Sequence, residues 1–158
     1  MAPMETHSPS RGDDSFGFLL VTAARLLRQR FEAALAAADL DMTPGEARTL
    51  VVADKLGPVR QTELAAALSI EPMSLVAHLD RLEARGMVER RPDPDDRRSK
   101  RVHLAPKARP ALRRILRVLG QAREQAMQDF GPDETAQFHD YLRRLCRSLG
   151  AAPGDGNG

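Results

Sequence analysis

Residues 61–104 place the strongest limit on the fold, because two short helical patterns are followed directly by two strand patterns. The helical patterns are QTELAAAL at 61–68 and EPMSLVAHLDRLEARG at 71–86. The strand patterns are MVERR at 87–91 and SKRVHL at 99–104, and they flank PDPDDRR, whose prolines and aspartates favour a turn. Two consecutive short helices followed by a basic hairpin predict a winged helix-turn-helix, in which the hairpin is the wing.

The second helical pattern has two distinct faces. Pro72 suits a helix start, and Gly86 suits a C-terminal cap. The leucines at i, i+4 and i+7 are expected in the core, namely Leu75, Leu79 and Leu82. The outer face is expected to reach base edges or phosphates of DNA, and it contains Met73, Ser74, Ala77, His78 and Arg81. For His78, an ordinary surface histidine is the alternative.

The wing is dense in positive charge. Its cations are Arg97, Arg98, Lys100 and Arg101. Such side chains on a turn can neutralise DNA phosphates, and an arginine at the tip can enter a minor groove. Asp95 or Asp96 can accept hydrogen bonds from turn amides or from Arg98, which would hold the wing in shape. A charge run alone is usually a solvated hairpin, but next to a helix-turn-helix it favours nucleic-acid binding.

Helical patterns also occur on both sides of this segment. Apolar positions at spacings of three and four predict a long amphipathic helix over 15–38. A second helix is predicted from Thr43, because a threonine N-cap, Pro44 at the first helical position and Glu46 three residues on form a capping box. This helix is expected to end near Gly57.

Two further helices are expected after the wing. The first runs to about Phe130, with Pro110 early enough to bend only its first turns, and a Gly131-Pro132 break precedes the last helix. The expected organisation is a disordered extension at 1–13, a dimerisation helix within 14–42, a winged-helix lobe at 43–105, dimerisation helices at 106–149 and a disordered tail at 150–158.

The outer helices contain more apolar positions than one small lobe can cover. Such stripes normally find a partner, so these helices are expected to form the interface of a homodimer. The residues expected at this interface are Phe16, Phe138, Leu142, Leu145 and Leu149. The apolar residues at the helix junctions are expected to be ordinary core residues, with a small-ligand pocket as the alternative; they are Phe16, Leu20, Leu50, Leu56 and Leu116.

Composition excludes several other classes of protein. The net charge of the 158 residues is only +2, so the distribution of charge matters more than its sum. The single cysteine, Cys146, allows no internal disulfide and is expected to be inert packing, with redox sensing as the alternative. No catalytic or metal-binding motif is found, so we expect no enzyme activity, cofactor or metal. The absence of an apolar run or signal-peptide pattern favours a cytoplasmic, nucleoid-associated protein.

These segments together resemble the MarR family of bacterial winged-helix transcription regulators. Asp96, Arg98 and Arg101 match the wing signature D-x-R-x-x-[KR], and MSLV and RRSKR are similar to the SlyA subgroup. Ala77 departs from that subgroup, which commonly has an arginine there, and Ala105 replaces the usual threonine after the wing. The resemblance implies a helical dimer platform and leaves the operator sequence undefined.

The sequence thus predicts a mainly α-helical protein with a small two- to three-stranded β-wing and a helical dimerisation platform. The expected function is sequence-specific regulation of transcription, as a repressor that binds a palindromic operator as a homodimer and is released by a small aromatic or lipophilic ligand. An architectural or protein-interaction dimer that uses the winged helix only as a scaffold is the alternative.

Overall fold

The computed structural model describes residues 15–150, so the expectations for 1–13 and for 151–158 lie outside the described residues. It contains six α-helices, a three-stranded sheet and one short 3-10 helix within that range. Their bounds are α1 Phe16–Ala37, α2 Pro44–Leu56, β1 Val59–Arg60, α3 Gln61–Leu68, α4 Pro72–Ala84, β2 Val88–Pro92, β3 Lys100–Leu104, the 3-10 helix Pro106–Ala108, α5 Arg109–Ala126 and α6 Pro132–Ser148. The predicted fold class is confirmed.

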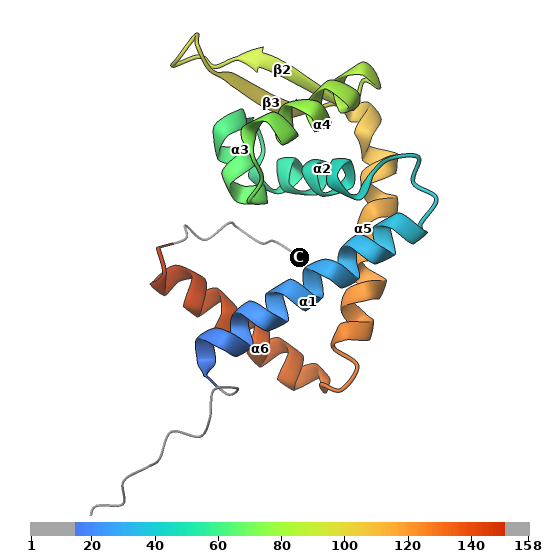
Figure 1. Cartoon of the computed structure of the whole chain (residues 1–158), viewed down its shortest axis with the longest axis vertical. Coiled ribbons are helices and arrows are strands. Elements are labelled where there is room, and N and C mark those ends of the chain that lie inside the picture. The colour runs from blue at the N-terminus through green and yellow to red at the C-terminus, as the bar shows by residue number, and fades with distance from the viewer. Residues whose placement is uncertain (1–14, 151–158) are drawn as a thin grey trace, which may run out of the picture.

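Two parts of the molecule are visible in Figure 1. The winged-helix lobe comprises α2, α3, α4 and the sheet, and it occupies one end of the molecule. The helical platform comprises α1, α5 and α6, and α5 runs from the lobe to the far end, where α6 lies. Because α1 crosses and packs against α5, the platform is joined to the lobe through α5 and through the contact of α1 with α2.

The helix starts follow local sequence signals. The hydroxyl of Ser15 accepts a hydrogen bond from the N–H of Phe18 at 3.2 Å, which caps α1. At α2 the predicted capping box is confirmed, because Thr43 and Glu46 exchange two side-chain-to-backbone hydrogen bonds, each 3.2 Å long. Gly86 follows α4 with a φ of +69°, a left-handed conformation that glycine adopts without strain.

The sheet has the strand order β1-β3-β2, and both pairings are antiparallel. The wing hairpin pairs Val88 with Leu104 at its base and Pro92 with Lys100 near its tip. The short strand β1 joins the other edge, where Arg60 lies opposite Arg101. This third strand places the residue that precedes α3 directly beside the wing.

The lobe is built around one apolar core. The predicted inner face of α4 is confirmed, since Leu75, Leu79 and Leu82 are all buried. They pack with Val88 and Val102 of the wing and with other core residues, including Leu50, Leu64, Leu112 and Ile115. Each such side chain contributes about 1.5 to 3 kcal/mol when buried. The core therefore fixes the rotation of α4 and sends its opposite face outward.

The last two helices are shorter than the sequence suggested. Helix α5 ends at Ala126 and not near Phe130, because residues 127–130 form turns. Helix α6 ends at Ser148, so Leu149 is its C-cap. Pro110 lies in the first turn of α5, where a missing N–H breaks no helical hydrogen bond. No helix between residues 15 and 150 is long and apolar enough to cross a membrane.

Candidate nucleic-acid interface

The outer face of α4 presents small and flexible side chains to solvent. Met73 is 76% exposed, and Ser74 and Ala77 are exposed beside it. They occupy the first turns of the helix, directly after Pro72. A proline is tolerated at this first position because an N–H there would have no partner within the helix. Without bulky side chains, this end of α4 can approach another surface closely.

The expectation that His78 faces outward is wrong. Its ring is half-buried between α4 and α2, and its Nδ1 lies 3.2 Å from Oγ1 of Thr49. The Thr49 hydroxyl donates to the carbonyl of Gly45 at 2.8 Å, so its oxygen is left to accept the Nδ1–H of His78. Burial, followed by the nearby positive charge of Arg81, lowers the pKa of His78. His78 therefore attaches α4 to α2.

Arg81 belongs to the same contact between α2 and α4. Its Nε donates to the buried carboxylate of Glu46, the capping-box residue of α2. Burial alone would raise the pKa of Glu46, but the hydrogen bonds from Arg81 and from the Thr43 N–H outweigh it, and the pKa is lowered. The Arg81 side chain remains 52% exposed. It is thus both a structural ion pair and an accessible cation.

The buried carboxylate of Asp93, a residue not predicted as part of the site, holds the wing in position. Asp93 accepts hydrogen bonds from Nε of Arg60 at 2.7 Å, from Nε of Arg101 at 2.8 Å and from the N–H of Asp95 at 2.8 Å. These donors, Arg60 first, hold the pKa of Asp93 far below its usual range. The only sign of this role in the sequence was the place of Asp93 at the start of the turn. Its pairing with Arg60 could not be predicted, because Arg60 is distant along the chain.

Arg101, which we expected among the cations that face DNA, is half-buried and paired with Asp93. Its role in the described structure is to join β3 to the start of the wing turn. Asp96 shows one of the arrangements predicted for it, since it accepts hydrogen bonds from the N–H of Arg98 and from the hydroxyl of Ser99, both at 3.0 Å.

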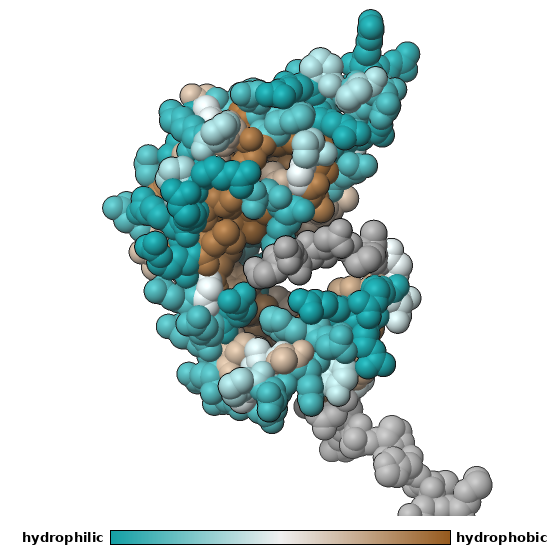
Figure 2. Space-filling view, turned by 180° about the vertical axis from the view of Figure 1, so that it is seen from behind, coloured by the Kyte–Doolittle hydropathy of each residue, from teal (hydrophilic) through white to brown (hydrophobic). Residues whose placement is uncertain are grey.

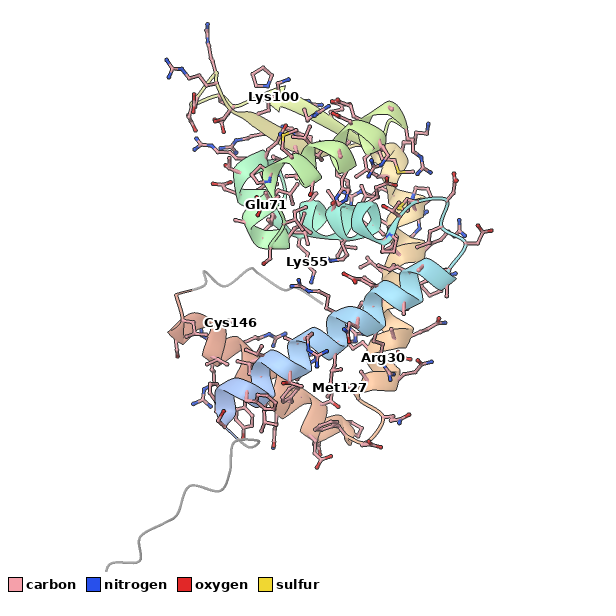
Figure 3. The ribbon with its side chains drawn as sticks, viewed as in Figure 1. Arg30, Lys55, Glu71, Lys100, Met127 and Cys146 are labelled. Carbon is pink, nitrogen blue, oxygen red and sulfur yellow. The ribbon has the colours of Figure 1, made fainter. Side chains whose placement is uncertain are left out.

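Three wing cations remain exposed: Arg97, Arg98 and Lys100. None of them forms an ion pair with any residue between 15 and 150. Figure 3 shows Lys100 in the wing, at the end of the molecule farthest from α6. A polar hollow of about 280 Å³ separates the wing from the start of α3, and it is lined by Arg60, Gln61, Thr62, Arg98, Ser99 and Lys100. This hollow has the charge and donors that suit a phosphate.

The residues expected at a dimer interface lie on the platform. Phe16 is 67% exposed and Leu149 75% exposed; Phe138 is exposed, whereas Leu142 and Leu145 are half-buried. No residue of α6 is buried among the described residues. Cys146 is also exposed on α6 of the single chain (Figure 3), so it does not pack into the chain's own core.

An apolar cavity of about 350 Å³ lies between α1, α2 and α5. It is lined by Ala24, Leu27, Arg28, Phe31, Arg48, Val51, Val52, Lys55 and Leu119. None of the five junction residues considered from the sequence is among them; Leu50 is core, and Phe16 is exposed at the other end of α1. Across residues 15–150, no three potential metal ligands are grouped.

Together the fold and this surface define a winged-helix protein with a helical platform. Residues 42–100 match the model of the MarR family. The similar crystal structures include a MarR-family transcriptional regulator from Rhodococcus sp. RHA1, which is 25% identical, with a TM-score of 0.71 over 87% of this chain and 96% of that one. A probable transcriptional regulator from Pseudomonas aeruginosa is 28% identical, with a TM-score of 0.62 over 84% and 98%.

A third similar structure is CouR from Rhodococcus jostii RHA1 bound to p-coumaroyl-CoA. It is 22% identical, with a TM-score of 0.67, and the match covers 86% of this chain and 95% of that one. The chain therefore has the winged-helix fold of MarR-family regulators over nearly the whole length of these relatives.

Proposed function

We propose that the chain is a DNA-binding transcription regulator, acting as a repressor, which binds a palindromic operator as a homodimer. The observation that supports it most is the pairing of two surfaces on the lobe. The exposed first turns of α4 present Met73, Ser74 and Ala77, and the neighbouring wing presents cations that no described carboxylate neutralises. A helix of this kind fits the major groove, while the wing reaches the adjacent backbone or minor groove.

The site residues have different parts in this proposal. Ser74 and Ala77 are the base readers, and Met73 packs against the edge of the groove. Arg97, Arg98 and Lys100 contact phosphates or the minor groove. Arg81 contributes a phosphate contact through its exposed side chain, whereas His78 and Arg101 act by holding α4 and the wing in place. The likeness of MSLV and RRSKR to the SlyA subgroup belongs to the same proposal.

The dimer follows from the uncovered apolar surface of the platform. Helix α6 has no buried residue, and the first half of α1 exposes five large side chains: Phe16, Phe18, Leu19, Val21 and Leu26. A second copy that packs on these helices would cover them. Two lobes on one two-fold axis would then engage both half-sites of a palindrome at high effective concentration.

A small ligand is proposed to release the DNA. The cavity between α1, α2 and α5 joins apolar walls to the cations Arg28, Arg48 and Lys55, which suits an aromatic or lipophilic anion. CouR, which has the same fold, is a relative crystallised with p-coumaroyl-CoA, an anionic aromatic compound. This cavity lies where the lobe meets the platform, so a bound molecule could alter the angle between them.

The experiment compares Arg98→Ala with Arg117→Ala in fluorescence anisotropy on a duplex that carries the palindrome upstream of the gene. Both changes remove one exposed arginine, but Arg117 lies on α5, away from the wing. We expect Arg98→Ala to cost about 1 to 3 kcal/mol per half-site, and Arg117→Ala to bind as the wild type does. Equal affinities for all three proteins would refute the role of the wing. Equal affinity for the palindrome and a mixed-sequence duplex would favour the scaffold alternative.

A further inference from the structure

Arg48 connects the cavity to the helix-turn-helix. Its Nη1 donates to Oε1 of Glu32 on α1 at 3.3 Å, and its Nη2 donates to the carbonyl of Leu68 at 3.2 Å. The side chain is only 24% exposed, and it forms part of the cavity wall. One guanidinium therefore touches the platform, the cavity and the last residue of α3.

Leu68 is the point at which the helix-turn-helix turns. The next residue, Ser69, is left-handed with a φ of +53°, and its N–H donates to the carbonyl of Ala66 at 3.0 Å. Carbonyl groups in the last turn of a helix have no partner within the helix, so an outside donor stabilises the end. Arg48 is such a donor to α3, and its positive charge also suits a helix C-terminus.

The three cations of the cavity differ in what they already bind. The side chains of Arg28 and Lys55 form no hydrogen bond or ion pair with any residue from 15 to 150, whereas Arg48 divides its two Nη groups between a carboxylate and a carbonyl. None of the nine residues that line the cavity is acidic. Figure 3 shows Lys55 on the side of α2 that faces α1. The cavity thus has an excess of positive charge over an apolar floor.

We propose that Arg48 is the residue through which a ligand in this cavity alters the helix-turn-helix. An amphipathic anion whose carboxylate or sulfonate lies against the cations binds both Nη groups of Arg48 in a two-point contact. Such a two-point contact with one anion is stronger than the two single contacts that Arg48 now makes, one to Glu32 and one to the neutral carbonyl of Leu68. The guanidinium then leaves Leu68 and Glu32, and the end of α3 loses its outside donor.

This inference rests on the proposed function for its effect on DNA, but the change at α3 is measurable without DNA. The probe is 1-anilinonaphthalene-8-sulfonate, with N-phenyl-1-naphthylamine as the matched neutral compound that lacks the sulfonate. Hydrogen exchange of the peptide 65–71 is measured on the full chain with each probe at saturation. We expect the sulfonate to raise exchange by about threefold to tenfold, and the neutral compound to leave it unchanged.

Two variants separate the coupling from the binding. In Arg48→Met, exchange of 65–71 should already be raised without a probe and should not rise further with it. In Lys55→Met, the anion should bind more weakly but produce the wild-type change at saturation, because the bond to Leu68 is intact. Equal effects of the two probes on the wild type, unchanged exchange at saturation, or a wild-type response in Arg48→Met would each overturn the inference.

The effect on DNA is measured separately. The sulfonate should weaken operator binding by the wild type and by Lys55→Met, and have no such effect on Arg48→Met, since coupling between two sites is reciprocal. A chain that binds no operator refutes the proposed function and leaves the exchange result to decide the role of Arg48. Operator binding that the sulfonate weakens equally in Arg48→Met refutes the role of Arg48 and leaves the proposed function standing.

Discussion

Replacing Gly45 by alanine should reveal how tightly α4 is fixed to α2. A β-carbon at this position would lie 2.6 Å from Cε1 and 2.7 Å from Nε2 of the His78 ring. Carbon and nitrogen atoms do not approach this closely, so the ring must rotate or α4 must shift. Either movement weakens the contact between Nδ1 of His78 and Oγ1 of Thr49, now 3.2 Å.

The magnitude follows from two opposing effects. Forcing a methyl group into a packed contact costs about 1 to 3 kcal/mol. Alanine is better than glycine inside a helix by roughly 0.5 to 1 kcal/mol. Gly45→Ala should therefore be neutral to destabilising by about 2 kcal/mol in the wild type. In a His78→Ala background the collision is absent, and the same change should be stabilising.

Urea unfolding of the wild type, the two single variants and the double variant, all at the same protein concentration, measures this coupling. We expect an interaction free energy of about 1 to 3 kcal/mol between positions 45 and 78. Gly120→Ala is the matched control, because an added β-carbon there meets no atom within 4 Å. It should have the same effect in both backgrounds. If Gly45→Ala changed the free energy of unfolding equally with and without His78, the proposed attachment of α4 would be refuted.

Three further changes test the other parts of the structure. Asp93→Ala should release Arg60 and Arg101, lower the thermal midpoint and weaken operator binding by about tenfold; binding at wild-type affinity would contradict the role of Asp93 in the wing. Burial, followed by the positive charge of Arg81, keeps the pKa of His78 in the folded chain below 6.5. As the pH falls, His78 is therefore protonated in the unfolded chain before it is protonated in the folded chain. Its contribution to stability is complete above pH 6.5 and is lost as pH falls through the folded-state pKa. Urea unfolding between about pH 8 and pH 5 should show a steeper loss for the wild type than for His78→Ala, and parallel curves would oppose this. Leu145→Glu should place a charge in the half-buried stripe of α6 and yield monomers or aggregate in sedimentation velocity, since each such leucine contributes about 1.5 to 3 kcal/mol; an intact dimer would exclude this stripe from the interface.

Local sequence signals were sufficient to predict the helices, the strands and the class of fold. The capping box of Thr43 and Glu46 depends on residues three apart, so it could be identified before any packing was known. The leucine spacing of α4 determined which face entered the core, because the helical period sets the rotation. The turn residues between β2 and β3 likewise placed the wing.

Contacts between distant residues could be decided only by the tertiary structure. The sequence places His78 beside Ala77 on the outer part of α4. In the structure its ring lies against α2, where Gly45 has no side chain to obstruct it and Thr49 provides a hydrogen-bond partner. Asp93 and Arg101 appeared as ordinary members of a charged hairpin until the third strand brought Arg60 beside them. Helical and strand periods specify a face of an element, whereas the partner of a long polar side chain depends on which other element packs there. That is why the class of fold was predictable from the sequence, while the division between structural and exposed cations was not.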